Sequence, residues 1–437
     1  MDILVYVDKI TPRLKYVFNH IFITSFGFNI KYTNDVDDFH HSTIYKINYS
    51  KKKIRDELFF FSSDIMFETD IHEQNITVST YNGQKVLFVC HKSALPFDIF
   101  AAIFYLLSRY EEYLPHKKDK IGRYLYTESI AYKNDFLNQP IIEYWLVFLK
   151  DILIKKFPKI EFKNHVFKFH NTIDIDNAFA FSEKSFLRNG MSLVKDLFYF
   201  DYKNIILRFK VLFFYTKDPY DTYDTILAVH EKFKLNTSIF FLLARYGIKD
   251  RGVNMYSNEL RLIIRKLAQK CNVGLHSSFN SITNTHRLSQ EINQINNILK
   301  TQVQCNRQHY LKLNMPFVYR NLLTSNITHD YSMGYPAYVG FRAGTSRSFV
   351  FFDLYDNDTT NLYIHPFSIM DTTLNDYMDL SPKNALSLIK DHIDLLRATN
   401  GTLTTIWHNE SFSYVSRWKH WDNVYINMIK YINNGRD

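Results

Sequence analysis

The sequence lacks several features that would assign it to a common class. Its 437 residues include only three cysteines, Cys90, Cys271 and Cys305, which are widely spaced and form no CxxC pair. This odd, scattered set argues against a disulfide framework and fits buried thiols in a reducing compartment. No apolar run approaches the ~18 residues that cross a bilayer. Residues 1–8 are typical of a first strand and not of a signal peptide. We therefore expect a cytoplasmic protein without a transmembrane segment.

Glycine-rich phosphate motifs are also missing. No GxGxxG sequence follows a predicted strand, which disfavours a dinucleotide site. The chain carries a net charge of +9, but its basic residues are scattered, and the densest groups, 51–53 and 117–120, are short. This spread favours a solvated surface over a nucleic-acid footprint, so no nucleic-acid partner is expected. The excess positive charge still permits anionic partners such as nucleotide- or lipid-linked sugars.

The apolar content is ample for two folded domains. Hydrophobic residues make up 46% of the chain and aromatic residues 17%, and the length exceeds one ordinary domain. Residues 1–155 contain mixed short strands and helices, which predicts a smaller α+β domain. Their clearest element is a helix from about residue 96, with apolar residues at helical spacing up to Leu107. Its aromatic and acidic end, residues 109–113, is predicted to pack on the second domain, with a position facing a functional site as the alternative.

From residue 165 to 437 the pattern changes to repeated strand and helix. About seven strands alternate with helices, which predicts parallel pairing with helices outside. At this number of strands a (β/α) barrel, complete or not, is favoured over an open doubly wound sheet. A long insertion at 181–217 carries apolar residues that suggest helices covering another surface.

Two aspartates end the first strand of this barrel. Asp174 and Asp176 are two residues apart, so both side chains point to the same side. Paired carboxylates are costly unless a cation lies between them or one holds a proton. A divalent metal with a neighbouring general base would meet both conditions, whereas two solvated or helix-capping aspartates are the alternative.

Titratable residues follow most of the other strands, where a barrel carries its chemistry. The set comprises His276 and Asn280, then Arg307, His309 and Tyr310, then His329, Asp330 and Arg342, then His365 and Asp371, and finally His408 and Glu410. A single histidine is more often structural, but polar residues at five strand ends are hard to explain by packing. Carboxylate and imidazole ligands together suit zinc first, with cobalt, nickel, manganese or iron as alternatives.

Residues 165–437 resemble the polysaccharide deacetylase family, that is, carbohydrate esterase family 4 with its NodB-like homology domain. The resemblance implies a deformed (β/α)7 barrel that removes acetyl groups from sugars with a bound metal. The family's first motif matches residues 172–176, with one residue inserted between the two aspartates. It makes Asp174 the base and Asp176 a metal ligand. The last motif matches residues 406–408 and makes His408 the acid.

The family's second motif, His-(Ser/Thr)-x-x-His, is only half retained. His276 matches the first ligand, and Asn280 replaces the second histidine. An asparagine oxygen is a poor zinc ligand, so His309 is the preferred third ligand and Asn280 the weaker alternative.

The third motif, an arginine near a proline-containing aromatic wall, is matched by residues 341–344 without the proline and more loosely by residues 307–310. We assign Arg307, Tyr310, Arg342 and Glu410 to substrate binding. Ion pairs from the arginines to Asp330 or Glu410, bracing the rim, are the alternative. The whole chain also resembles a divergent bacterial group that carries an N-terminal domain of unknown function. Residues 94–98, 307–310 and 407–410 carry that likeness.

The predicted function is a metal-dependent hydrolase acting on C–N amide bonds other than peptide bonds. Its substrate would be an acetylated sugar or glycan, and no oligomeric state is predicted. Two other functions stay open. One is a carbohydrate-binding descendant of the barrel without catalysis. The other is a glycoside hydrolase that uses Asp174 and Glu410 as its carboxylate pair.

Overall fold

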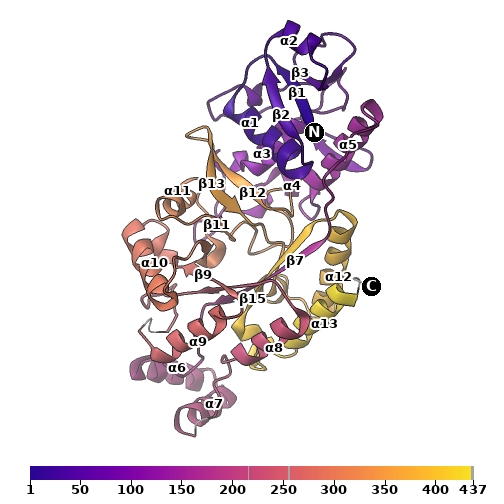
Figure 1. Cartoon of the computed structure of the whole chain (residues 1–437). Coiled ribbons are helices and arrows are strands. Elements are labelled where there is room, and N and C mark those ends of the chain that lie inside the picture. Colours follow the sequence, from indigo (N-terminus) through magenta and orange to yellow (C-terminus); the bar gives the residue numbers. More distant parts are fainter. Residues whose placement is uncertain (215, 254–255, 435–437) are drawn as a thin grey trace.

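The computed structural model describes residues 1–214, 216–253 and 256–434. It is an α/β protein with a small N-terminal parallel sheet and a larger, mostly parallel sheet (Figure 1), which confirms the predicted class. Among the described residues, no helix combines the length and the apolar character needed to cross a membrane.

The N-terminal part is built on a four-stranded sheet in the order β2-β1-β3-β4, with every neighbouring pair parallel. The strands are β1 (Asp2–Val7), β2 (Asn29–Thr33), β3 (Tyr45–Ser50) and β4 (Leu58–Phe61), and a separate antiparallel hairpin pairs β5 (Val78–Tyr81) with β6 (Gln84–Leu87). The helices are α1 (Pro12–Phe18), α2 (Val36–His41), α3 (Ile99–Leu107), α4 (Ile130–Lys133) and α5 (Ile141–Lys156). α5 ends at Lys156 and β7 begins at Lys168, so the predicted domain boundary at residues 155–165 falls at the end of α5 and in the segment that follows it. The division of the chain into two domains stays a prediction.

The end of α3 packs on the larger part, as predicted. The helix begins after Asp98, whose carboxylate caps it by accepting from the backbone N–H groups of residues 100 and 101. Beyond its last turn, Glu112 is buried and accepts two hydrogen bonds from Arg342, at 2.8 and 2.6 Å. Phe104 also packs edge-on against Phe352, with 5.3 Å between ring centroids. The two parts of the chain therefore share one buried core.

The larger sheet has nine strands in the order β12-β13-β11-β10-β9-β8-β7-β15-β14. All neighbouring pairs are parallel except β12 with β13. The strands are β7 (Lys168–Ile175), β8 (Thr237–Phe241), β9 (Asn272–Ser277), β10 (Cys305–Gln308), β11 (His329–Asp330), β12 (Phe349–Asp353), β13 (Asp358–Ile364), β14 (Ile369–Met370) and β15 (Thr402–His408). Within the described ranges, no pairing joins β14 to β12, so the sheet is open between its ends.

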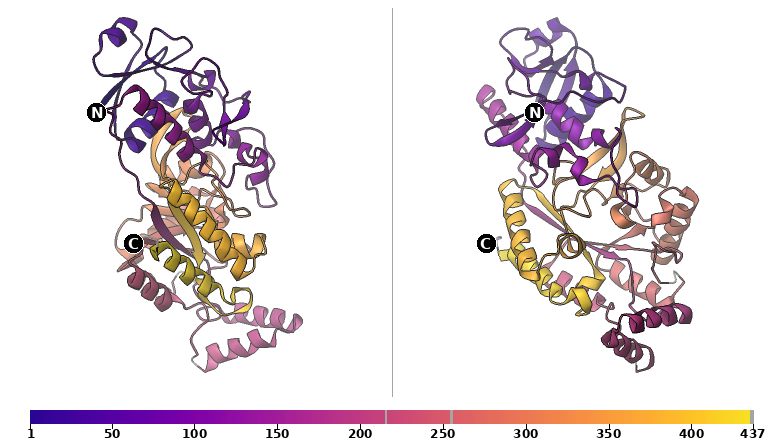
Figure 2. Two further views of the ribbon diagram at one scale, coloured as in Figure 1. Left: turned by 90° about the vertical axis from the view of Figure 1, so that its right-hand side faces the viewer. Right: turned by 180° about the vertical axis from the view of Figure 1, so that it is seen from behind.

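Helices follow most of these strands. They are α8 (Tyr223–Phe233), α9 (Asn258–Ala268), α10 (Thr285–Leu299), α11 (Phe317–Thr324), α12 (Pro382–Ala398) and α13 (Trp421–Asn434). Two more, α6 (Phe186–Phe198) and α7 (Tyr202–Phe213), form the predicted insertion. They were expected to cover another surface, but they project from the end of the molecule farthest from the N-terminal part (Figures 1 and 2). Their outer faces are exposed.

Strand register brings the predicted site residues to one edge of the sheet. In the pairing of β15 with β7, His408 lies opposite Asp174, and in the pairing of β10 with β9, Arg307 lies opposite His276. Because the strands are parallel, their carboxyl ends meet at the same edge, where loops supply functional groups. All three cysteines are buried, as predicted.

Candidate metal centre and active site

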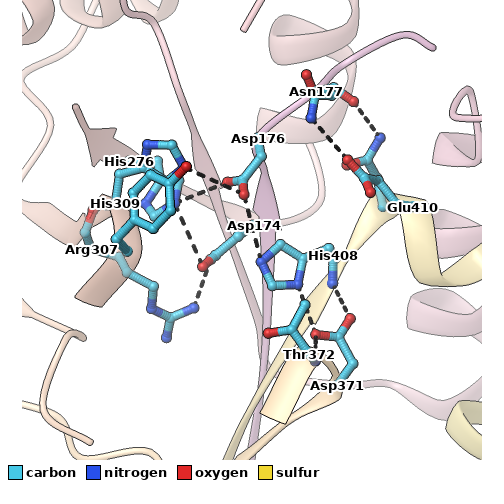
Figure 3. Close-up of polar contacts among 12 residues, drawn as sticks. Asp174, Asp176, Asn177, His276, Arg307, His309, Asp371, Thr372, His408 and Glu410 are labelled. Atoms are coloured by element: carbon cyan, nitrogen blue, oxygen red, sulfur yellow. Dashed lines mark hydrogen bonds and ion pairs between the residues drawn. The ribbon is translucent and has the colours of Figure 1, made fainter. Parts of the chain in front are cut away.

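Three side chains converge at this edge of the sheet. Asp176 follows β7, His276 lies in β9, and His309 begins a short 3₁₀ turn after β10. One ligand atom from each lies within 4.8 Å of the others, so the three form a candidate metal-binding group. Nε2 of His276 is 3.0 Å from one carboxylate oxygen of Asp176, and Nε2 of His309 is 3.5 Å from the other (Figure 3).

The second nitrogen of each imidazole fixes its orientation. Nδ1 of His276 lies 2.8 Å from the backbone carbonyl of Arg307, and Nδ1 of His309 lies 2.9 Å from a carboxylate oxygen of Asp250. A carbonyl or an ionised carboxylate only accepts, so each Nδ1 carries a proton and each Nε2 is the nitrogen left to bind a metal. Both Nε2 atoms face Asp176, and proteins orient metal-ligating histidines in this way.

The electrostatics of the three residues fit a cation between them. Burial raises the pKa of Asp176, but the neighbouring His309 and His276 outweigh it and hold that pKa well below its ordinary value. Burial lowers the pKa of His309, and the carboxylates of Asp176 and Asp250 raise it to about 9. Each carboxylate oxygen of Asp176 faces one of the two imidazoles. One carboxylate between two imidazoles is the donor set expected for zinc or a similar divalent ion.

Asp174 lies beside this group and is held by an arginine. One of its carboxylate oxygens accepts from Nη1 of Arg307 at 2.7 Å, and the other lies 3.9 Å from Nε2 of His276. Arg307 is fully buried and also donates to the hydroxyl of Thr172 and the carbonyl of Tyr331. These contacts favour the alternative considered from the sequence, in which Arg307 braces the site through an ion pair. Its partner is Asp174, and not Asp330 or Glu410.

His408 approaches the same group from β15. Its Nδ1 lies 2.7 Å from Asp371, and its Nε2 lies 3.8 Å from Asp176. Burial lowers the pKa of His408, whereas Asp371 and then Asp176 raise it to about 10. Asp371 is itself buried and also accepts from the backbone N–H of His408 at 2.7 Å. The imidazole is thus fixed with Nε2 directed at the site and Nδ1 turned away.

A cavity of about 190 Å³ lies in front of these residues. Besides the five side chains already described, its wall contains Arg123, Tyr310, Leu311, Pro336, Met370, Thr372, Asp376 and Tyr377. Arg123 belongs to the N-terminal part and donates to the carbonyl of Tyr310 at 3.0 Å. Residues from both parts of the chain therefore shape the site.

Three other predicted site residues have different neighbours. Asn280 donates to Asp250 at 3.0 Å and is outside the group that could hold a metal. Arg342 is buried and bound to Glu112, a bracing partner other than the two considered from the sequence. Glu410 accepts from Asn177 at 2.9 Å.

The remaining strand-end histidines form a separate pair. His329 and His365 are hydrogen-bonded to each other at 2.9 Å. They line a different cavity with Asn272 and Cys305, which begin β9 and β10. Sequence reasoning did not single out Asp250, and it included Asp371 among the strand-end residues without a specific role. Asp250 lies in an irregular loop without a motif, and Asp371 follows a two-residue strand.

Comparisons with known proteins find one family model over the N-terminal part and solved structures of low similarity. The model of a family of unknown function, DUF7033, matches residues 3–158, and no curated protein matches the chain. Among solved structures, the polysaccharide deacetylase Bc1974 from Bacillus cereus is 11% identical, with 62% of this chain and 89% of that chain covered and a TM-score of 0.31. Puue allantoinase is 9% identical, with 62% and 88% covered and a TM-score of 0.40. A mutant of BA3943, a CE4 family pseudoenzyme with restored enzymatic activity, is 11% identical, with 61% and 63% covered and a TM-score of 0.28. Because these TM-scores lie below 0.5, what the site does is inferred from its own side chains.

Proposed function

We propose that this chain is a metal-dependent hydrolase that removes an acetyl group from an N-acetylated sugar or a sugar-bearing intermediate. The observation that carries the proposal is the shared orientation of His276 and His309. Both imidazoles are fixed through Nδ1, and both present Nε2 to the carboxylate of Asp176. In this reading the nine-stranded sheet is an open, deformed form of the (β/α)7 barrel.

The ligand set replaces the histidine that the sequence motif lacks. Asn280 is bound to Asp250, and His309 from the neighbouring strand end supplies the third donor. Two imidazoles and one carboxylate leave positions open for substrate and water. A divalent ion bound there would polarise an acetyl carbonyl and lower the pKa of a water molecule.

The protein's own groups then handle the protons. Arg307 holds one oxygen of Asp174 and thereby orients this carboxylate. The other oxygen, on the side of His276, accepts a proton from the attacking water. His408 is held by Asp371 at Nδ1 and donates from Nε2 to the leaving amine. Tyr310 and Glu410 remain our candidates for sugar contacts, and Leu311 and Met370 form apolar wall beside the reacting group.

The first experiment is to measure the metal content of the purified protein. We expect one divalent ion per chain in the wild type and its loss in Asp176→Ala, His276→Ala and His309→Ala. Asn280→Ala serves as the matched control and should keep the ion. Acetate release from oligomers of N-acetylglucosamine is the next assay. A wild-type protein that binds no metal after incubation with zinc, cobalt and nickel would contradict the hydrolase mechanism and favour a carbohydrate-binding protein.

A further inference from the structure

A second cavity lies next to the metal centre and is lined by positive charge. It measures about 490 Å³ and lies between α6, α7 and the loops that follow β7 and β8. Asn177 in its wall directly follows the metal ligand Asp176, and Arg251 directly follows Asp250. A molecule bound in this cavity would therefore lie beside the reacting centre.

Five basic residues line this cavity, and no acidic residue does. They are Lys184, Arg188, Lys195, Arg208 and Arg251. Arg208 is paired with Asp196 at 2.6 Å, whereas the other four have no ion pair within the described parts of the chain. The ammonium of Lys184 donates to the carbonyl of Ala180, and burial and then Arg188 lower its pKa to about 8. Asp218 and Glu410 act on Lys184 in the opposite sense, but neither of them lines the cavity, whose wall therefore carries a net positive charge.

We propose that this cavity binds a phosphoryl group, either phosphate or diphosphate, of the molecule that carries the acetylated sugar. The inference rests on the proposed function only for the identity of the sugar. The cationic side chains would bind a phosphoryl group even if that function were wrong. Guanidinium and ammonium groups are the usual protein partners of phosphate. The volume lies within the range of small-molecule sites. A neutral glycan would leave these charges unused.

Binding of inorganic pyrophosphate, measured by calorimetry, tests this site. We expect binding to zinc-loaded and to chelator-treated protein, because the cations do not depend on the metal. Lys184→Gln combined with Arg251→Gln should weaken binding at least tenfold in both forms. Lys232→Gln, which removes an exposed charge on α8, should leave it within twofold. Pyrophosphate binding to the zinc-loaded form alone would overturn the proposal, and so would equal affinity of the double variant and the wild type. Pyrophosphate binding to a protein that never takes up metal would overturn the proposed function and leave the phosphoryl site standing.

A separate observation concerns the outer faces of α6 and α7. Each helix carries four large apolar residues at the spacing i, i+4, i+7 and i+11. They are Leu187, Met191, Val194 and Phe198 on α6, and Tyr202, Ile206, Phe209 and Phe213 on α7. All eight side chains are 44–76% exposed. An exposed stripe of four large apolar side chains on each helix is the kind of surface that marks an interaction site.

The charges around these stripes indicate the partner. On the opposite side of the helices, Asp196 and Arg208 are buried against each other. Lys195, Lys203 and Lys210 are exposed and sit roughly 90° from the stripes, at the helical rotation of ~100° per residue. An apolar helix face with aromatic residues and flanking lysines is suited to the surface of an anionic bilayer.

We propose that the α6–α7 hairpin (residues 186–213) docks on a membrane that contains anionic lipids. A two-fold contact with a second copy would gather the flanking lysines of both copies around one apolar interface, which is unfavourable. The helices are 13 and 12 residues long, too short to span a bilayer but suited to lie on it. Docking would place the cationic cavity near phosphorylated lipids.

Co-sedimentation with vesicles tests the docking. The wild type should bind vesicles of phosphatidylglycerol and phosphatidylcholine and not phosphatidylcholine alone. Phe198→Ser with Phe213→Ser, and Lys203→Glu with Lys210→Glu, should each reduce binding at least fivefold. Val147→Ser, which removes an exposed apolar side chain on α5, is the control and should not. Failure of the wild type to bind anionic vesicles would overturn the proposal. If light scattering then shows that the wild type is a dimer and that the Phe198→Ser, Phe213→Ser variant is a monomer, the hairpin binds a second copy of the chain instead of a membrane.

Discussion

Replacing Asp250 by asparagine tests which nitrogen of His309 faces the metal. Asp250 is fully buried and lies 2.9 Å from Nδ1 of His309. Burial raises the pKa of Asp250, but hydrogen bonds from His309 and from the backbone N–H of Phe279 hold it below its ordinary value. The carboxylate is therefore charged and fixes Nε2 as the free donor. Asparagine can still accept from Phe279, but it removes the negative charge that strengthens His309 as a ligand.

The expected loss can be estimated from this contact. Removing the partner of a metal-ligating histidine typically lowers metal affinity about 10- to 100-fold. That corresponds to about 1.4 to 2.8 kcal/mol of binding free energy. The assay is zinc affinity, measured by competition with a chromophoric chelator at neutral pH.

Asp371→Asn provides the matched control. Asp371 makes the same kind of contact, 2.7 Å from Nδ1 of His408, but His408 lies outside the metal-binding group. We expect this variant to keep zinc affinity within about threefold and to lose activity. If Asp250→Asn leaves zinc affinity unchanged, or both variants weaken it equally, His309 is not the distinguishing ligand and our assignment fails.

Three other predictions concern single buried groups. Asp174→Asn should keep its zinc and release acetate at least ~100-fold more slowly; equal activity would exclude Asp174 as the base. Arg307→Met should lower the free energy of unfolding of the metal-free protein by about 3–5 kcal/mol, because Asp174 is left buried without its partner. Adding Asp174→Asn should recover part of that loss in urea denaturation, and a loss below ~1 kcal/mol would refute the pairing. Burial raises the pKa of Glu291 to about 7, so the folded state holds a proton that the unfolded state releases, and stability falls as the pH rises from about 4.5 to 7. Glu291→Gln should therefore be more stable than the wild type at pH 8, by about 3 kcal/mol, and the difference should vanish near pH 4.

The sequence by itself identified the residues that end the strands. Asp174, Asp176, His276 and His408 lie in β7, β9 and β15 or one residue beyond them, and His309 directly follows β10. The alternation of strands and helices predicted parallel pairing, and parallel strands place their carboxyl ends at one edge. These inferences needed only local periodicity and chain order, which is why they were accessible without coordinates.

Only the tertiary structure assigned the partners of these residues. Arg342 was placed near the substrate from its motif, but it is paired with Glu112, 230 positions earlier in the chain. Asp250 and Asp371 orient imidazoles from loops that have no periodic pattern. The apolar residues of the 181–217 insertion were expected to cover another surface, yet Leu197, Phe198 and Ile206 are more than half exposed. Hydrogen bonds and ion pairs between distant segments depend on how strands and loops pack together, whereas strand ends follow from the local pattern of side chains along the chain.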